Sequence, residues 1–404
     1  MTQRLVSAGE RRARLGLRHR LTEPAESVPA LADDLVVLHA TDPATIYLSA
    51  APRIDGVTVA DVDSALFEDR TVLRTLAMRR TLFVASTETV PVVEGSSSGA
   101  VASVERRRLE TFLADSGIED PPGWLAHVAL EVLDALDGGG PDGLQARELT
   151  KAVPTLATRI VMAAGTKHSV EAGATSRVLG LMAVEGLLIR GRPTGDWTGR
   201  QYRWFRRDRW WPNREVPRLG EVDETEASIE LLRRWLHRFG PATVADMKWW
   251  TGWTMGKTRK ILAAIDTAEV SIEDGTGGAV SGFLLANDLA PVADQPPWAA
   301  LLPSLDPTAM GWKERDWYLG DHRARLFDRN GNIGPTVWVD GRIVGGWSQD
   351  PTGAVVTRLL EPVGPENTAL IDDAVARTAA FLGETVVKPS FPTPLQKELS
   401  TGLR

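Results

Sequence analysis

Arginine and aromatic side chains alternate in one segment of the chain, residues 200–218. The segment reads RQYRWFRRDRWWPNREVPR, and its arginines are Arg200, Arg203, Arg206, Arg207, Arg209, Arg214 and Arg218. Guanidinium groups neutralise phosphates and release counterions, and aromatic rings can stack on exposed bases. Because side chains alternate between the two faces of a hairpin, some of these rings must face a core instead. The segment predicts contact with nucleic acid through several of its arginines.

Other kinds of chemistry have little support in the residue types present. The chain contains no cysteine, which excludes disulfides, thiolate metal sites and cysteine nucleophiles. Its histidines show no metal-ligand spacing, and there is no HExxH, GxGxxG or P-loop pattern. We therefore expect no metal and no cofactor.

Composition places the chain among ordinary globular proteins. It has 404 residues, of which 43% are hydrophobic and 25% charged, and a net charge of -7. That length suggests about two to four domains. No run of about 18 apolar residues occurs, so we expect no membrane-spanning helix. The basic N-terminus lacks the apolar core of a secretory signal, and we expect a cytoplasmic protein.

The order of expected elements repeats three times along the chain. Each repeat reads as helices followed by a two-stranded wing, which is typical of winged helix-turn-helix units. From residue 291 the composition of the sequence changes. Pro-rich segments appear, and Asn-Gly and Asp-Gly turns between apolar runs indicate hairpins. We predict an α+β chain with three tandem winged helix-turn-helix units and a C-terminal β-barrel. The expected domains are 1–137 (first unit with an N-terminal arm and a helical extension), 138–220, 221–290, and 291–404 (β-barrel and C-terminal helix).

Local signals fix several of these elements. Ser27 is expected to cap an amphipathic helix that Pro43 ends, and Thr58 is expected to cap the next helix. A first wing strand is expected over residues 81–85. The Gly/Ser stretch at 95–99 is expected to break a helix, and Gly383 to end the C-terminal one.

Several segments together are similar to one known family. They are LVVLHATDPATIYLSAAPRI, MRRTLFVAS, SRVLGLMAVEGLLIRGR, RRWLHRFGPATVADMKWWTGW, LLPSLDPTAMGWKERD and VWVDGRIVGGW. In this order they resemble the tandem winged-helix family that contains the AlkZ/YcaQ-type DNA glycosylases. The resemblance implies winged helices around a DNA-sized concave surface, and an activity that removes N7-alkylated purines and unhooks interstrand crosslinks.

The resemblance also marks a catalytic segment. Family glycosylases carry Gln-x-Gln or Gln-x-Asp where this chain has His39 and Thr41. An N7-alkylguanine is already cationic, so the enzyme must mainly hold a water near C1′ and stabilise an oxocarbenium-like sugar. Side chains at i and i+2 of an extended segment point the same way, so His39 and Thr41 could hold that water, with His39 also a weak base. Asp42 could add a carboxylate. Alternatively, His39 is a packing residue, and Thr41 and Asp42 cap the segment after Pro43.

Basic residues outside the 200–218 segment are further candidates for DNA contact. Arg79 and Arg80 precede the first wing strand, where they could contact phosphates or a minor groove. Lys257, Arg259 and Lys260 lie on the expected recognition helix of the third unit. Arg323 and Arg325 could contact one flank of a duplex. Each of these groups could equally form a solvated face.

Two hypotheses about function arise from these residues. The first is a monofunctional DNA glycosylase that hydrolyses the N-glycosidic bond of alkylated nucleotides, either N7-purine adducts or crosslinks. The second is a DNA-binding protein without catalysis, such as a damage sensor or a transcription regulator, which the His39 and Thr41 departures favour. Both predict double-stranded DNA as the partner and no membrane. We expect a monomer. Sequence-specific regulators usually dimerise to match two half-sites, so a monomer with one concave basic face would favour the glycosylase hypothesis.

Overall fold

The structure is a computed structural model that describes residues 3–162, 169–211, 215–217, 219–275 and 277–402. His168, Arg214 and Arg218 lie outside these residues. The described chain is a mixed α+β fold with several small sheets, none of which closes into a barrel.

The first unit follows the order helix, strand, helices, two strands. Its elements are α2 (Val28–Asp34), β2 (Leu38–His39), α3 (Pro43–Ala50), α4 (Val59–Asp63), η1 (Ser64–Glu68), β3 (Val72–Ala77), η2 (Met78–Arg80) and β4 (Thr81–Ser86). Ser27 caps α2 and Thr58 caps α4, as expected. The last strand, β4, lies between the other two, in the order β2-β4-β3.

The helix expected to run from Ser27 to Pro43 is shorter than that. It ends at Asp34, and Val36 adopts a left-handed backbone with φ of 64°. Pro43 begins α3 instead of ending a helix, because the first turn needs no amide proton and favours the fixed φ of proline. This correction places His39 in a strand, while Asp42 caps the helix after it.

The connection to the second unit is a long helical segment. It consists of α5 (Val90–Val93), η3 (Glu94–Ser98), α6 (Gly99–Asp115) and α7 (Pro121–Gly138). The Gly/Ser stretch at 95–99 does not break the helix as expected. It forms the π-helical turn η3 and runs directly into α6, and the Ser96 hydroxyl donates to the Val93 carbonyl at 3.1 Å.

The second and third units end, like the first, in a helical segment followed by two antiparallel strands. The second unit follows α7 and contains β5 (Leu144–Gln145), α8 (Ala146–Ala152), η4 (Pro154–Ala157), β6 (Arg159–Met162), β7 (Val170–Gly173), α9 (Thr175–Val184), β8 (Leu188–Pro193), β9 (Tyr202–Arg206) and η5 (Arg207–Arg209). The third contains α10 (Glu224–Phe239), α11 (Val244–Thr251), α12 (Met255–Leu262), β10 (Thr267–Glu273), β11 (Ala279–Leu285) and η6 (Ala286–Asp288). The sheet of the second unit is ordered β5-β9-β8, so its last strand is again central. In the third, β11 lies between β10 and a bridge to Ala242.

The N-terminal elements β1 (Leu5–Val6) and α1 (Ala8–Arg18) join the third unit, where β1 pairs in parallel with β10. The C-terminal region holds β12 (Ala299–Leu302), α13 (Asp316–Leu319), η7 (Gly320–His322), α14 (Arg323–Leu326), β13 (Thr336–Val339), β14 (Arg342–Gln349), β15 (Val355–Leu359), α15 (Pro365–Leu382) and α16 (Pro394–Ser400). Its four strands form an open antiparallel sheet in chain order where a barrel was expected. The helix that Gly383 was expected to end is α15, and Gly383 follows it directly.

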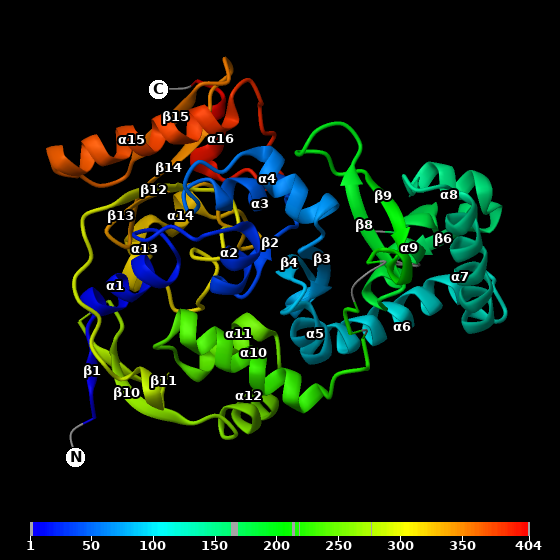
Figure 1. The fold of residues 1–404 in the computed structure, drawn as a ribbon, viewed down its shortest axis with the longest axis horizontal. Helices are drawn as coiled ribbons and strands as arrows, with labels where there is room; N and C mark the ends of the chain where they lie inside the picture. Colours follow the sequence, from blue (N-terminus) through cyan, green and yellow to red (C-terminus); the bar gives the residue numbers. More distant parts are fainter. Residues whose placement is uncertain (1–2, 163–168, 212–214, 218, 276, 403–404) are drawn as a thin grey trace.

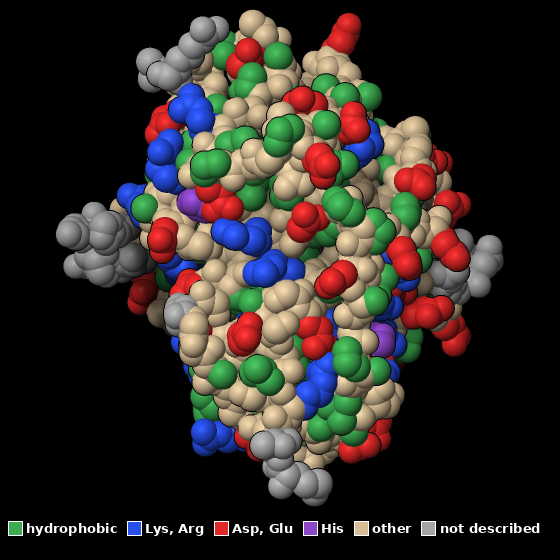
Figure 2. All heavy atoms as spheres, turned by 90° about the vertical axis from the view of Figure 1, so that its left-hand side faces the viewer, with side chains coloured by type: hydrophobic (Ala, Val, Ile, Leu, Met, Phe, Trp, Pro, Cys, Tyr) green, Lys and Arg blue, Asp and Glu red, His purple; other side chains and the backbone are tan. Residues whose placement is uncertain are grey.

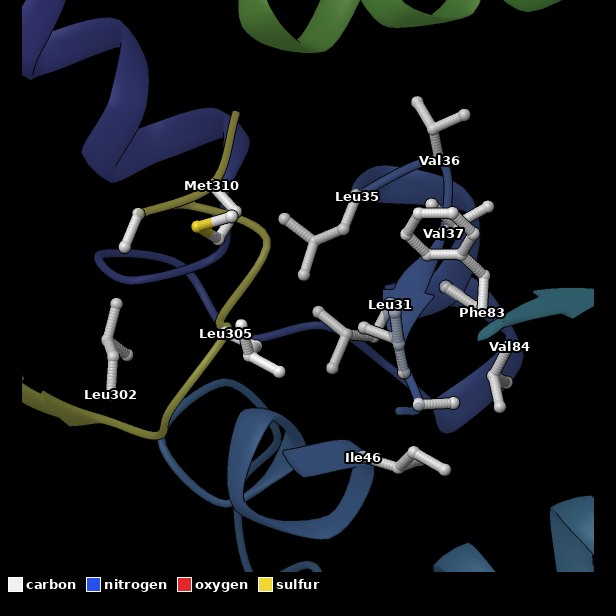
Figure 3. Packing of buried hydrophobic residues seen from close by; sticks show 14 of the residues in the cluster. Leu31, Leu35, Val36, Val37, Ile46, Phe83, Val84, Leu302, Leu305 and Met310 are labelled. Atoms are coloured by element: carbon white, nitrogen blue, oxygen red, sulfur yellow. The ribbon is translucent and has the colours of Figure 1, made fainter. Parts of the chain in front are cut away.

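Two large hydrophobic cores and one small one hold the described elements together. One large core contains mostly residues of the first unit, the third unit and the C-terminal region, and the other joins α6 and α7 to the second unit, while the small one joins β1 to β10 and β11. Figure 1 shows the second unit, with α8 and α9, and the preceding α7 at one side of the molecule, away from β12 to β15. Leu305 and Met310, from the segment after β12, face Leu31 of α2 and Leu35, which follows α2 (Figure 3). Residues distant in the sequence therefore pack against the first unit.

Candidate functional site

His39 lies at the end of β2 and is buried. It pairs in register with Phe83 of β4, and the two rings meet edge to face with centroids 5.5 Å apart. The backbone N–H of Thr41 donates to His39 Nδ1 at 3.4 Å. An imidazole that accepts a hydrogen bond at Nδ1 carries its proton at Nε2 when it is neutral. His39 can therefore orient a ligand oxygen by donation from Nε2.

The environment of His39 keeps the imidazole uncharged. Burial, together with the positive charge of Arg79, lowers its pKa to about 3. At neutral pH the ring is therefore not the charged imidazolium. It is a neutral hydrogen-bonding group held in a fixed position.

Thr41 and Asp42 have different surroundings. Thr41 is exposed, so its hydroxyl can reach a ligand directly. Asp42 is only 5% exposed, and its Oδ1 accepts from the N–H of Ala44 at 3.3 Å, which caps α3. Its Oδ2 accepts from the hydroxyl of Ser390 at 2.6 Å and from the N–H of Ser390 at 3.2 Å. The Asp42 carboxylate is thus held by three donors, and the expected cap on the helix that Pro43 begins is present.

Ser390 is a site residue that sequence reasoning missed. It lies 348 positions after Asp42, in the segment between α15 and α16, and no local pattern marks it. Its hydroxyl also accepts from Arg200 at 2.6 Å. Arg200, Ser390 and Asp42 therefore form a hydrogen-bonded chain that joins the second unit, the C-terminal region and the candidate catalytic segment.

A small cavity lies beside this chain. Its volume is about 30 Å³, and Asp42, Thr45, Ser304 and Gln396 are among the residues that line it. Gln396 Oε1 is buried and has no hydrogen-bond partner within the described part of the chain. A cavity of this size that several polar side chains line can hold a water molecule.

Arg79 and Arg80 form the turn between β3 and β4. Both have positive φ, 55° and 56°. The Arg79 guanidinium lies 4.0 Å from the ring centroid of Trp249 on α11, so the turn docks on the third unit. Arg80 is exposed and pairs with Glu105 of α6 at 2.6 Å.

Most of the arginines in the hairpin segment have partners inside the protein. Arg206 pairs with Asp137 and with Asp208, and the buried Arg207 pairs with Glu94 at 2.9 Å. Arg203 donates to the Gly143 carbonyl at 3.0 Å. Arg209 is highly exposed, and its contact with Asp137 is 4.0 Å long. Trp204 of β9 and Trp210, which follows η5, are buried, in line with the expectation that some rings of this segment face a core.

The remaining basic candidates fall into two groups. Lys257 pairs with Glu224 at 2.5 Å, and Arg325 pairs with Glu398 at 2.7 Å. Arg259 and Lys260 are exposed on α12 and form no ion pair with a described residue. Arg323 is exposed beside the ring of Phe327. Arg209, Arg259, Lys260 and Arg323 are thus the predicted contacts whose charge is most available.

The described residues lack the features of a membrane span or a metal site, and their charges are mixed on one face. Among the described residues no helix is both long and apolar enough to cross a bilayer, and no group of three potential ligands is placed to hold a metal. On the face at the left of Figure 1, basic and acidic side chains are interspersed and no stripe of one sign is visible (Figure 2).

Comparison with known proteins relates this chain to one family. The sequence profile of the family described as "DNA glycosylase AlkZ-like" matches residues 32–381. The fold is similar to that of the Streptomyces sahachiroi DNA glycosylase AlkZ, with a TM-score of 0.70, 20% sequence identity, and coverage of 95% of this chain and 98% of that one. No curated protein matches the sequence. The profile match spans most of the chain, including the His39–Asp42 segment, and the chain therefore belongs to the DNA glycosylase AlkZ-like family.

Proposed function

We propose that this protein is a monofunctional DNA glycosylase that hydrolyses the N-glycosidic bond of alkylated nucleotides, either N7-purine adducts or crosslinks. The observation that carries the proposal is the family match, which runs through the His39–Asp42 segment. The geometry supports it, because a neutral His39 stands two residues from an exposed Thr41 hydroxyl.

The proposed mechanism uses these two side chains to place a water. His39 Nε2–H donates to the water oxygen, and the Thr41 hydroxyl accepts from one of its protons. The bond between C1′ and the cationic base breaks, and the base leaves with the bonding electrons, which neutralises it. The water oxygen then bonds to C1′, and its proton passes to solvent. The products are the free base and an abasic site, and Asp42 acts by fixing the backbone that carries Thr41.

The repeated units and the DNA partner belong to the same proposal. We assign the three repeats as winged helices, at 1–137, 138–220 and 221–290, followed by the C-terminal region at 291–404. The helical segment followed by two antiparallel strands in each repeat supports this assignment, as does the central last strand of the first and second units. The proposed partner is double-stranded DNA, bound by a cytoplasmic monomer.

A second candidate function is DNA binding without hydrolysis, as in a damage sensor or a transcription regulator. The specific observation that favours it is the state of His39. Its side chain is only 6% exposed, and its Nδ1 is occupied by a backbone N–H. A side chain held in this way can serve packing alone.

An excision assay separates the two candidates. The protein is incubated with duplex DNA that carries one N7-methylguanine, and separately with an N7-linked interstrand crosslink, and abasic sites are counted. We expect the wild type to release the base. His39→Ala should lower the rate of release by about 100-fold or more, since positioned acid–base groups contribute about 10²–10⁴-fold. His39→Gln should retain release. Arg233→Ala, which alters an exposed arginine paired with Glu230, is the matched control. Binding of the duplex without release from either substrate would establish the second candidate instead.

A further inference from the structure

A groove between α6 and α9 collects guanidinium groups that the sequence analysis did not select. Its volume is about 100 Å³, and it is lined by Arg108 of α6, Arg177 of α9 and Arg190 of β8. The three residues lie far apart in the sequence, and only the packing of these elements brings them together. Helix α9 occupies the position in the second unit that α12 occupies in the third.

The positive charge of the groove is not balanced by acidic residues. Glu105 also lines the groove, but it is already paired with Arg80. Within the described chain, Arg108, Arg177 and Arg190 form no ion pair. Arg108 and Arg190 lie near the rings of Phe112 and Trp204, at 5.6 Å and 4.9 Å, and Arg177 donates only to the Met162 sulfur at 3.4 Å.

A fourth guanidinium lies close enough to Arg190 to interact with its charge. Arg74 of β3 is only 4% exposed, and none of its three side-chain nitrogens makes a hydrogen bond with a described residue. The rings of Phe67 and Tyr202 flank it, with centroids 5.3 Å and 5.2 Å from the guanidinium carbon. Burial, and more weakly the charge of Arg74, lowers the pKa of Arg190 to about 10, which leaves Arg190 protonated at neutral pH. Two neighbouring guanidinium groups, of which Arg74 is buried and Arg190 half-buried, repel one another, and an anion bound beside Arg190 in the groove would offset that cost.

One wall of the groove has no side chain. Gly180 lines it from the middle of α9, and a Cβ atom added there would meet no atom within 4 Å. Glycine in a helix interior is less favourable than alanine by about 1 kcal/mol. A backbone without a side chain allows close approach by a ligand.

We propose that the α6–α9 groove binds a phosphate of the DNA backbone. The proposal rests on the proposed function, since it takes DNA as the ligand. Leu76 of β3 forms one wall of the groove and pairs in register with Leu82 of β4, whose carbonyl accepts from the N–H of Ala40. Two strand spacings, roughly 10 Å, thus separate Leu76 from the residue after His39.

The test measures the salt dependence of binding to an undamaged duplex. Fluorescence anisotropy gives Kd for the wild type, Arg108→Ala, Arg177→Ala and Gly180→Glu between about 50 and 200 mM salt. Gly180→Glu places a negative charge in the groove and removes no contact. Gly9→Glu on α1, where the added Cβ meets only Ser7 Oγ at 3.6 Å, and Arg233→Ala are the matched controls. Thermal unfolding confirms that each variant is folded.

We expect the slope of log Kd against log salt to fall by about 0.9 in each arginine variant. Gly180→Glu should raise Kd at low salt. Both controls should match the wild type in slope and in Kd. If the wild type binds DNA and the groove variants keep its slope and Kd, the groove proposal is overturned and the proposed function stands. If the wild type does not bind DNA, both are overturned. A parallel titration with inorganic phosphate identifies the other source of this ligand: loss of phosphate binding in variants with unchanged DNA binding also overturns the proposal.

Discussion

At the scale of single residues, the imidazole of His39 is the group whose environment matters most. A buried histidine is kept neutral by desolvation, and here the charge of Arg79 adds to that effect. The resemblance in sequence matches His39 to a glutamine of the family glycosylases, and glutamine is also a neutral hydrogen-bonding side chain. Under the proposed function, a neutral His39 would therefore replace that glutamine more closely than a charged histidine would.

The neutral state of His39 predicts a pH dependence of stability. Its pKa is about 3 in the folded protein and near 6.5 when unfolded. Between these values the unfolded chain binds one more proton, so stability falls as pH drops below 6.5, by about 1.4 kcal/mol per pH unit. His39→Gln should remove this component of the slope, while the slope from the buried His19, whose pKa is also lowered, remains.

Urea unfolding at pH 7.5, 6.0 and 5.0 measures this effect. The matched control is His127→Gln, which alters an exposed imidazole and should leave the wild-type slope. Parallel stability curves for the wild type and His39→Gln would show that His39 is hydrated in the folded protein.

At the scale of elements, the helix α3 begins where the candidate catalytic segment ends. Asp42 caps the N-terminus of α3, and Ser390, from the segment between α15 and α16, donates a hydrogen bond to Asp42. The π-helical turn η3 shows the same principle, because its buried Glu94 accepts from Thr75 of β3 and from Arg207 of η5. Two sites that look irregular in sequence are thus fixed by side chains from other elements.

Ser390→Ala should destabilise the protein by about 1–3 kcal/mol, because it removes a hydrogen bond to a buried carboxylate. The N–H of Ser390 and the cap on α3 remain, so the effect stays below that of losing Asp42. Chemical denaturation compares the variant with Ser103→Ala, an exposed serine on α6 whose loss should cost less than about 0.5 kcal/mol. Equal stabilities for the two variants would contradict the role given to Ser390.

At the scale of the whole molecule, one buried ion pair ties the first unit to the C-terminal region. Arg53, which follows α3, and Asp306, which follows β12, are both fully buried. Two parallel hydrogen bonds of 2.8 Å join them, and Arg53 also donates to the carbonyls of His19 and Ser49. Together with the shared core, this pair packs the first unit and the C-terminal region against one another.

Asp306→Ala should cost about 3–5 kcal/mol, because it leaves the Arg53 charge buried without its partner. Glu171→Ala is the comparison, since it breaks the exposed pair with Arg159 and should cost at most about 1 kcal/mol. Urea denaturation followed by tryptophan fluorescence reports both values. A cost for Asp306→Ala as small as that for Glu171→Ala would mean that Arg53 finds water or another partner.

The sequence by itself determined the features that depend on neighbouring residues. The caps at Ser27 and Thr58, the strand at 81–85 and the glycine after α15 follow from local hydrogen bonding and backbone preference, and all are present. The family also followed from segments of the sequence. The helix expected to end at Pro43 was wrong, because proline favours the start of α3 as strongly as it ends a helix elsewhere.

Only the tertiary structure decided which charges are available and what surrounds the site. Arg206 and Arg207 look free in the sequence, but acids 69 and 113 positions away pair with them. Ser390 reaches Asp42, and Arg108, Arg177 and Arg190 meet in one groove, although no local spacing relates them. The open C-terminal sheet likewise depends on how strands pair over long separations. Local sequence sets the conformational preferences of a segment, whereas the pairing of charges and the shape of a groove depend on contacts that form only when distant segments pack.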